Sequence, residues 1–139
     1  PFTVRKTLTQ KGGILFLSNS SSRANPANIV QNQIPPSGTA YNNSFTNTYI
    51  DIDNDATTWM SSSDQLNLPT CTEISWAGLY WGGKITTSTA NYITRGNIKL
   101  KVNNGAYQQL TADQTINNTT GAVSYFSFKN ITFNLLPWT

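Results

Sequence analysis

The stretch that decides the fold runs from Glu73 to Trp81 and reads Glu-Ile-Ser-Trp-Ala-Gly-Leu-Tyr-Trp. Successive side chains of a β-strand point to opposite faces, which places Trp76 and Tyr80 on one face and Trp81 on the other. Both faces are largely apolar, as in a central strand that is covered on both sides. We therefore predict a central strand, with Trp76 and Tyr80 in the core and the strand end at the Gly-Gly pair that follows Trp81.

Short segments with the composition of strands, separated by turn residues, make up much of the rest of the chain. Asn103-Asn104-Gly105 contains residues that tolerate positive φ, so it predicts a hairpin between its flanking segments. No segment has sustained helical spacing, and the many Thr, Tyr, Phe, Ile and Val residues favour a pleated surface. We expect an all-β fold, an antiparallel β-sandwich or jelly roll that is incomplete in this chain. The predicted strands and extended segments are 2–17, 48–53, 73–81, 98–102, 106–110 and 123–133.

The chain of 139 residues has the length of a single domain. We predict a single β-sandwich domain over residues 1–139, or the N-terminal part of one. A long polar loop at residues 18–47 has no periodicity, contains Asn-Pro and Pro-Pro-Ser-Gly turns, and is expected on the surface. The apolar ending Leu135-Leu136-Pro137-Trp138 predicts that the natural chain continues. It also predicts that the strand at 123–133 lies at a sheet edge or pairs with another chain.

Charged residues make up only 11% of the chain, against about 25% in an ordinary soluble domain. Asn, Thr, Ser and Gln take their place, a composition that we interpret as that of an exported, extracellular protein. The formal net charge of +3 comes from basic residues that form no run or helical stripe, which argues against nucleic-acid binding. No apolar stretch approaches the ~20 residues needed to span a bilayer, so no membrane span is expected.

The residue inventory argues against an enzyme. The chain has no histidine, which removes the commonest general base and the usual zinc ligands. The single cysteine, Cys71, is either a buried small hydrophobe or pairs with a residue outside this chain. Glu73, the only glutamate, could act with an aspartate as a glycosidase pair, but no spacing selects a partner. We expect no catalytic residue, and a glycosidase fragment built on Glu73 is a third hypothesis, behind the two given below.

The sequence contains one cluster of charged residues, in which three aspartates lie within five positions: Asp51, Asp53 and Asp55. In an extended chain Asp51 and Asp53 lie on the same side, about 7 Å apart, which suits oxygen ligands of one hard cation. An EF-hand loop would need glycine and glutamate where this chain has Ala56 and Ser62, so that motif fails. Two interpretations stay open. One is a calcium site with all three aspartates as ligands, and the other is an Asp/Asn-rich turn whose side chains cap local backbone groups.

Trp59 and Trp81 are the candidate ligand-binding residues. Exposed aromatic rings offer a platform on which sugars stack, although aromatic residues on a strand are more often core. Trp81 stands next to the Gly-Gly pair at the predicted strand end, which makes it the best candidate for exposure.

Two stretches together resemble a known family. One is Tyr49-Ile-Asp-Ile-Asp-Asn-Asp55 followed by a serine-rich stretch, and the other runs from Cys71 to Gly83 and contains Ala-Gly-Leu-Tyr-Trp-Gly-Gly. This pattern is similar to the N-terminal β-rich region of large type IX-secreted surface adhesins of Bacteroidota, the gliding-motility adhesin family. The likeness covers about residues 49–132, with its specific motif around residues 77–83. It implies surface attachment and gliding, and it names no catalytic residues.

Residues and resemblance together predict a non-enzymatic extracellular adhesin or filament module on the bacterial cell surface, for surface attachment or gliding motility. Its loops, especially residues 18–47, would be presented to a surface, a polysaccharide or another subunit. Its partners would be other chains or the remainder of a larger surface protein, and surface polysaccharide. The alternative is a carbohydrate-binding β-sandwich module that uses Trp59 and Trp81.

Overall fold

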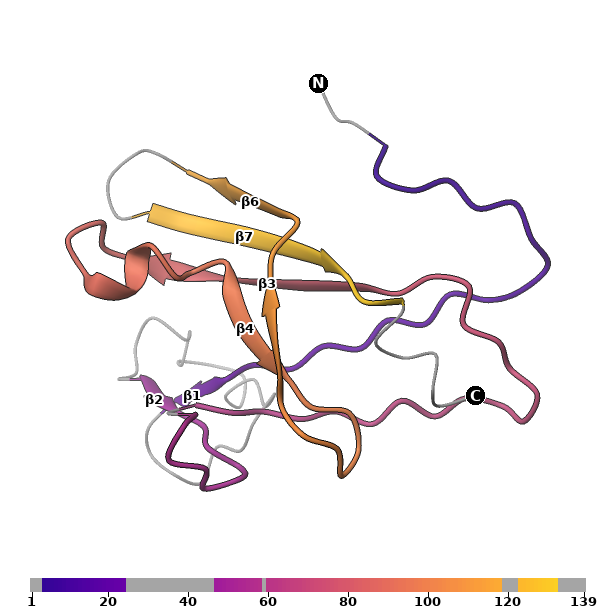
Figure 1. Ribbon diagram of the computed structural model, residues 1–139, viewed down its shortest axis with the longest axis horizontal. Helices are drawn as coiled ribbons and strands as arrows, with labels where there is room; N and C mark the ends of the chain where they lie inside the picture. Colours follow the sequence, from indigo (N-terminus) through magenta and orange to yellow (C-terminus); the bar gives the residue numbers. More distant parts are fainter. Residues whose placement is uncertain (1–3, 25–46, 59, 119–122, 133–139) are drawn as a thin grey trace, which may run out of the picture. The chain divides into compact units, whose positions relative to one another are not determined.

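The computed structural model describes residues 4–24, 47–58, 60–118 and 123–132 of the chain (Figure 1). The described residues are nearly all β, and their strand pairings are antiparallel, which confirms the predicted all-β class. The chain divides into two compact units, Pro1–Asn67 and Leu68–Thr139. The elements are β1 (Ser22–Ala24), β2 (Asn47–Tyr49), β3 (Gly78–Ile85), the 3-10 helix η2 (Ala90–Tyr92), β4 (Asn97–Leu100), β5 (Gln108–Thr111), β6 (Gln114–Asn117) and β7 (Val123–Asn130).

The first unit contains the pairing of β1 with β2. The backbone N–H of Ile50 donates to the carbonyl of Ser21 at 3.0 Å and continues this ladder, and the Ile50 side chain is buried. Residues 4–17 carry no strand, and the side chain of Phe16 is 90% exposed. The two strands lie at the described ends of the predicted loop at 18–47, whose residues 25–46 lie outside the described part of the chain.

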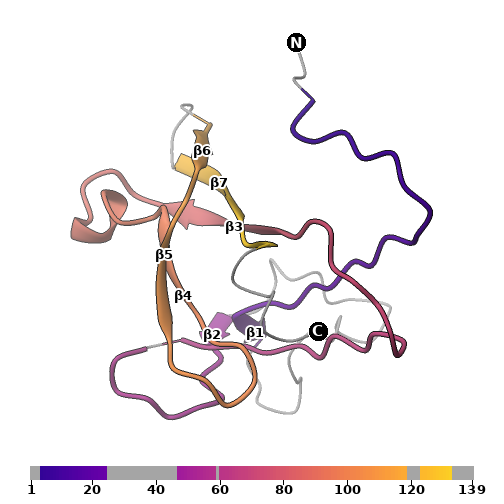
Figure 2. The same ribbon diagram turned by 45° about the vertical axis from the view of Figure 1, so that its right-hand side comes forward.

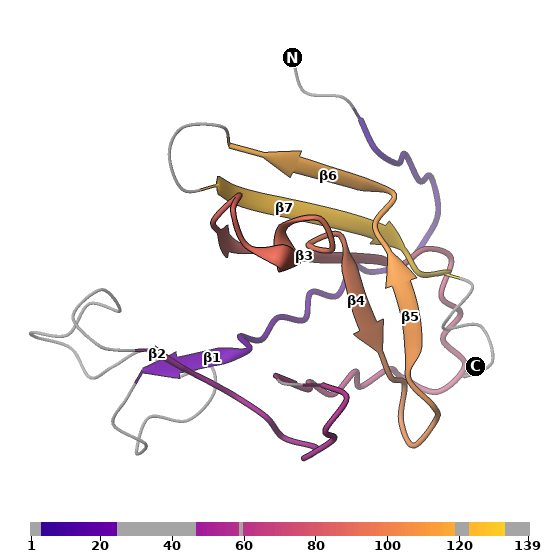
Figure 3. The same cartoon turned by 60° about the vertical axis from the view of Figure 1, so that its left-hand side comes forward.

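The second unit contains a three-stranded antiparallel sheet in the order β3-β7-β6 (Figures 1 and 3). β7 is the central strand. It pairs with β3 over all 8 residues of each strand, from Gly78 opposite Asn130 to Ile85 opposite Val123. On its other edge β7 pairs with β6.

These positions correct two predictions from the sequence. The predicted edge position of the 123–133 strand is wrong, because β7 is hydrogen-bonded on both edges. The predicted central position of the 73–81 strand is also wrong, because β3 begins at Gly78 and, within the described residues, pairs on one edge only. For the 73–81 strand, the physical reason is that apolar alternation reports burial of the faces of a strand and carries no information about its edges. Val123, Ser127 and Phe128 are buried, so each face of β7 is covered in part, whereas Phe126 is 70% exposed.

β3 runs through Gly82-Gly83, so the strand end predicted at this pair is wrong. The reason is that aromatic residues of β7 lie over both glycines. A Cβ atom built on Gly82 would lie 2.5 Å from the backbone oxygen of Tyr125 and 3.0 Å from Cδ1 of Phe126. One built on Gly83 would lie 3.4 Å from Cε1 of Tyr125. The rings cover the surface that each glycine leaves bare, which offsets the weak strand propensity of glycine.

The β4–β5 hairpin forms a two-stranded sheet in the same unit. Its turn follows the sequence prediction, because Asn103 has a φ of 50° and the Gly105 N–H donates to the carbonyl of Val102 at 3.1 Å. Leu110 of β5 is buried. The hairpin predicted around Asn103-Asn104-Gly105 is therefore confirmed.

Ala112 and Asp113 alone separate β5 from β6, so two residues carry the chain from one sheet to the other (Figures 2 and 3). The Ala112 N–H donates to the carbonyl of Gly96 at 2.8 Å, and the Asp113 N–H donates to the carbonyl of Phe128 at 2.8 Å. The hydrogen-bond ladder thus changes its partner strand between consecutive residues. We call Ala112 and Asp113 the corner.

The Asp113 carboxylate fastens the corner to the end of β7. Its Oδ1 accepts from Lys129 Nζ at 2.6 Å, and its Oδ2 accepts from the backbone N–H of Asn130 at 2.8 Å. Both bonds favour the ionised form, so they hold the pKa of Asp113 below its usual 3.8, with the Lys129 hydrogen bond as the largest cause.

Gly82→Ala is expected to lower the free energy of unfolding by about 1–3 kcal/mol, because the new methyl group meets a backbone oxygen of the central strand. Gly83→Ala is the matched control. Its methyl group makes an ordinary contact with the Tyr125 ring, so the loss is expected to stay below about 1 kcal/mol. Urea denaturation followed by tryptophan fluorescence measures both variants. Equal losses at the two positions would contradict the close approach of β7 at Gly82.

Asp113 makes the stability of the chain depend on pH. Its folded-state pKa is lowered, so its contribution is present above the unfolded-state pKa and disappears as the pH falls through the folded-state pKa. Between about pH 5 and about pH 2, the free energy of unfolding should fall more steeply for the wild type than for Asp113→Asn. The difference is expected to be small, since Asp113 is 42% exposed and water screens exposed ion pairs. Urea denaturation measures both proteins. If their free energies of unfolding fall in parallel as the pH is lowered, this role of Asp113 is refuted.

Candidate functional site

One face of the β3-β7-β6 sheet carries a group of exposed apolar side chains. Because side chains alternate along a strand, the register places Tyr80 and Gly82 of β3, Phe126 of β7 and Ile116 of β6 on this face. Phe126 is 70% exposed, Tyr80 61% and Ile116 55%. We call Tyr80, Gly82, Ile116 and Phe126 the aromatic face. Large apolar side chains that gather on adjacent strands differ from the scattered single ones that every surface carries.

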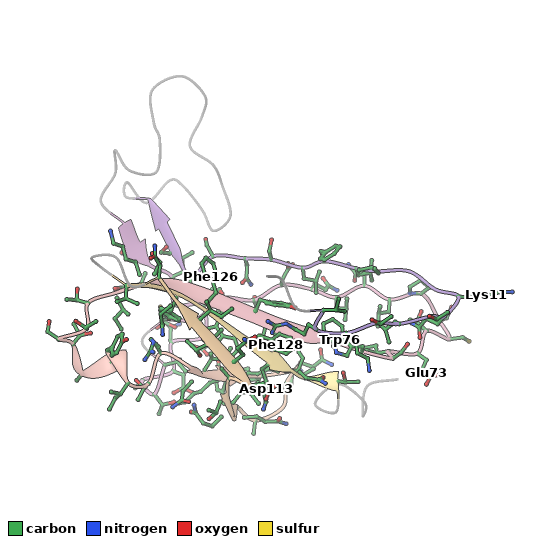
Figure 4. All side chains as sticks on the ribbon, turned by 90° about the horizontal axis from the view of Figure 1, so that it is seen from above. Lys11, Glu73, Trp76, Asp113, Phe126 and Phe128 are labelled. Atoms are coloured by element: carbon green, nitrogen blue, oxygen red, sulfur yellow. The ribbon has the colours of Figure 1, made fainter. Side chains whose placement is uncertain are left out.

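Phe128 anchors the aromatic face to the sheet. It lies on the same face as Phe126 and is buried. Its ring centroid lies 5.0 Å from that of Tyr80, with the planes tilted by 47°, and 6.3 Å from that of Trp76, with the planes stacked at 18°. Figure 4 shows Phe126, Phe128 and Trp76 in succession along the sheet. The Tyr80 ring is therefore held against Phe128 while most of its surface stays in solvent.

An open depression of about 240 Å³ is lined by Tyr80, Trp81, Gly82, Phe126 and Ser127. Alternation along the strands turns the side chains of Trp81 and Ser127 to the opposite face, so these two residues contribute backbone to the depression. Its side-chain lining therefore consists of the rings of Tyr80 and Phe126. Gly82 adds no side chain to the lining, and the Phe126 ring lies over it, with Cδ1 3.0 Å from the position that a Cβ atom would take.

Neutral polar residues border the aromatic face at both ends of the sheet. By register they are Ser124 and Asn118 at one end, where the charged Lys84 also lies, and Gln114 and Asn130 at the other. Among the described strand positions on this face, Lys84 is the only charged residue. The face therefore combines aromatic rings with amide and hydroxyl groups and carries little charge.

The tryptophans predicted as ligand-binding residues are not part of the aromatic face as described. Trp81 points to the opposite face of β3, where it is half-buried and its Nε1 donates to the carbonyl of Arg95 at 3.1 Å. Trp59 lies outside the described residues. The expected exposure along β3 is therefore reversed, because Tyr80, expected in the core, is exposed, whereas Trp81 is half-buried.

Arg95 organises the opposite face of the sheet. Its guanidinium carbon lies 4.0 Å from the centroid of the Tyr92 ring, its Nε donates to Asn117 Oδ1 at 3.0 Å, and its Nη1 donates to the Tyr92 carbonyl at 2.6 Å. Burial raises the pKa of Tyr125 on this face, and the positive charge of Arg95 partly opposes that shift. The two faces of the sheet thus differ in their chemistry. Arg95 makes polar contacts on this face, whereas exposed apolar side chains form the aromatic face.

Asp51, Asp53 and Asp55 lie in a turn that follows β2 in the first unit. Asp53 is its centre, because its Oδ1 accepts from the Asp55 N–H at 3.2 Å, from Thr58 Oγ1 at 3.2 Å and from Ser61 Oγ at 3.0 Å. These contacts match the predicted turn in which aspartate side chains cap local groups.

Ser61 lies between two of these carboxylates, a role that the sequence analysis missed. Its Oγ lies 2.9 Å from Asp51 Oδ1 and 3.0 Å from Asp53 Oδ1, and it accepts from the Ile52 N–H at 2.9 Å. A serine hydroxyl has one proton, so it donates to one carboxylate at a time. Within the described residues, no group of three or more His, Cys, Asp or Glu side chains is arranged to hold a metal. Calcium at the three aspartates stays a prediction.

The residues considered for catalysis have other surroundings. Glu73 is exposed, and both carboxylate oxygens of Asp113 accept hydrogen bonds from the end of β7 (Figure 4). Cys71 is exposed and has a φ of 64°. The predicted alternative of a buried small hydrophobe at Cys71 is therefore wrong.

Comparison with known protein families, with curated proteins and with solved structures finds no match to this chain. In the part of the chain that the structure describes, no helix is long and apolar enough to cross a membrane. The candidate site is therefore defined by the geometry of the aromatic face itself.

Asp53→Ala is expected to speed amide hydrogen exchange at Asp55 about fivefold, because the Asp55 N–H loses its acceptor. Asp53→Asn keeps an acceptor oxygen and should exchange at nearly the wild-type rate if the carboxylate acts through hydrogen bonds alone. NMR of the full chain, with calcium and then with excess chelator, measures both variants. Protection that rises with calcium in the wild type and is lost in Asp53→Asn would instead establish a metal site at this turn.

Proposed function

We propose that this chain is a non-enzymatic extracellular module that attaches a larger protein to an external surface, with the aromatic face as its contact. The observation that carries this proposal is the exposure of Tyr80, Phe126 and Ile116 on three adjacent strands. Covering apolar surface contributes about 25 cal/mol for each Å² removed from water. A ligand that covers this face therefore removes its apolar surface from water, and this burial favours binding.

The sheet presents its two rings in a fixed geometry. Phe126 belongs to β7, which is paired on both edges, and the Tyr80 ring packs against the buried Phe128. Side chains that are ordered before binding lose little conformational entropy when the ligand arrives, so more of the burial free energy appears as affinity. This property suits a contact that must hold under load.

The resemblance to type IX-secreted gliding-motility adhesins of Bacteroidota supports the cellular context. The specific motif of that resemblance, residues 77–83, contributes Tyr80 and Gly82 to the aromatic face. In this proposal the chain is part of an adhesin or filament on the bacterial cell surface and serves attachment or gliding. Its partners are the remainder of the surface protein and the material to which the cell attaches.

A self-standing carbohydrate-binding module is the second candidate function. The depression beside Tyr80 and Phe126, with neutral polar residues at both ends of the face, favours it. The two candidates use the same face and differ in whether the chain acts within a larger surface protein.

Beads that carry the full chain should stay attached to polysaccharide-coated glass under flow. The double variant Tyr80→Ala/Phe126→Ala should lose retention about tenfold, the equivalent of about 1.4 kcal/mol. Phe16→Ala is the matched control, because Phe16 is 90% exposed and lies outside the aromatic face. Retention is counted at increasing flow on polysaccharide-coated, alkyl-coated and bare glass. If the wild type attaches to none of them, or is retained no better than the double variant, the proposal is wrong.

A further inference from the structure

We infer that the ligand of the aromatic face is a neutral glycan chain whose sugar rings stack on Tyr80 and Phe126. This inference rests on the proposed function and names the chemical class that the face binds. It follows from the placement of the two rings, from the uncharged surroundings of the face, and from the size of its apolar area.

The two rings are placed as neighbours across one strand pair. Phe126 lies opposite Gly82, and Tyr80 lies two residues further along β3, so Tyr80 and Phe126 are diagonal neighbours on one face. Diagonal positions of an antiparallel pair are roughly 7–8 Å apart. Consecutive rings of one glycan chain can therefore contact both side chains. The open depression lies beside the two rings, so a sugar ring can approach them from solvent.

The chemistry of the face matches that of a sugar ring. A pyranose presents C–H groups on its faces and hydroxyl groups at its rim. The negative π-face of an aromatic ring attracts such C–H groups, and amide and hydroxyl side chains form hydrogen bonds with sugar hydroxyls. Gln114, Asn118, Ser124 and Asn130 supply neutral polar groups at the two ends of the face. Lys84 is the only charged residue at the described strand positions of this face, so strongly charged ligands are not selected.

The apolar area of the face is of a size that a few sugar rings can cover. A phenylalanine or tyrosine side chain buries about 150–250 Å² when it is fully covered. With Phe126 70%, Tyr80 61% and Ile116 55% exposed, the face offers roughly 300–500 Å² of apolar surface. A stable protein interface takes about 800 Å² from each partner. Since somewhat more than half of such an interface is apolar, a second copy would need most of this apolar surface together with the polar residues around it, whereas a few sugar rings would cover the apolar surface by themselves.

Isothermal titration calorimetry of the full chain tests the inference with three soluble probes, namely cellohexaose, xylohexaose and mannohexaose. We expect the wild type to bind at least one of them. Tyr80→Ala and Phe126→Ala should each weaken that binding by about tenfold or more, whereas Phe126→Trp should retain it, because a larger ring preserves the stacking surface. Phe16→Ala is the control and should bind as the wild type does. Urea midpoints of all variants confirm that the fold is kept, which is expected because Tyr80 and Phe126 are exposed.

Two-dimensional NMR gives the position of the bound probe. Amide shifts that change at Gly82 and Ser127, which line the depression, would support the inference. Binding to none of the three probes, or binding that Phe126→Ala and Tyr80→Ala leave unchanged, would overturn it. Sedimentation that shows a dimer lost in Phe126→Ala would also overturn it, in favour of a second copy as the occupant. The two proposals can fail separately. If bead retention depends on Tyr80 and Phe126 but no glycan binds, the attachment function is supported and only the glycan inference is wrong.

Discussion

The second unit depends on the pairing of β3 with β7, in which 8 residues of one strand lie opposite 8 of the other. This ladder places Phe126 and Tyr125 over the Gly82-Gly83 pair, and the other edge of β7 positions β6. The corner is fastened to the same strand through Asp113. A slip of the register by one residue would turn every side chain of β3 to the other face, so Tyr80 would leave the aromatic face. The candidate site is thus a direct product of one strand register.

Local chemistry decides the all-β class and the hairpin turn at Asn103, so both could be predicted from the sequence. The position of each strand in its sheet could not. The alternation of side chains does not depend on whether one or both edges of a strand are hydrogen-bonded. The apolar pattern of β3 therefore resembled that of a central strand. Gly82-Gly83 misled for a related reason, because the rings that let the strand continue through it come from β7, far along the chain.

The acidic turn was visible in the sequence because Asp51, Asp53 and Asp55 are near one another in the chain, although the contact of Ser61 with two of them was not. The aromatic face was missed because it joins residues of three strands and exists only in one register. A partial signal was present. Gly82 and Gly83 of β3 match Phe126 and Tyr125 of β7 when the two segments are written antiparallel, which is the pattern expected where rings cover glycines.

The β3–β7 ladder also has a direction of mechanical weakness. Gly78 and Asn130 lie opposite each other, so the chain enters β3 and leaves β7 at the same end of the ladder. Tension on the two flanking segments therefore unzips the pairs one after another and does not shear all 8 together. Unzipping needs less force, since each step breaks only the bonds of one pair. Tyr80 and Phe128 form the third pair from this end, so opening the ladder here separates Tyr80 from Phe126, and the aromatic face stays intact only when load enters the chain elsewhere.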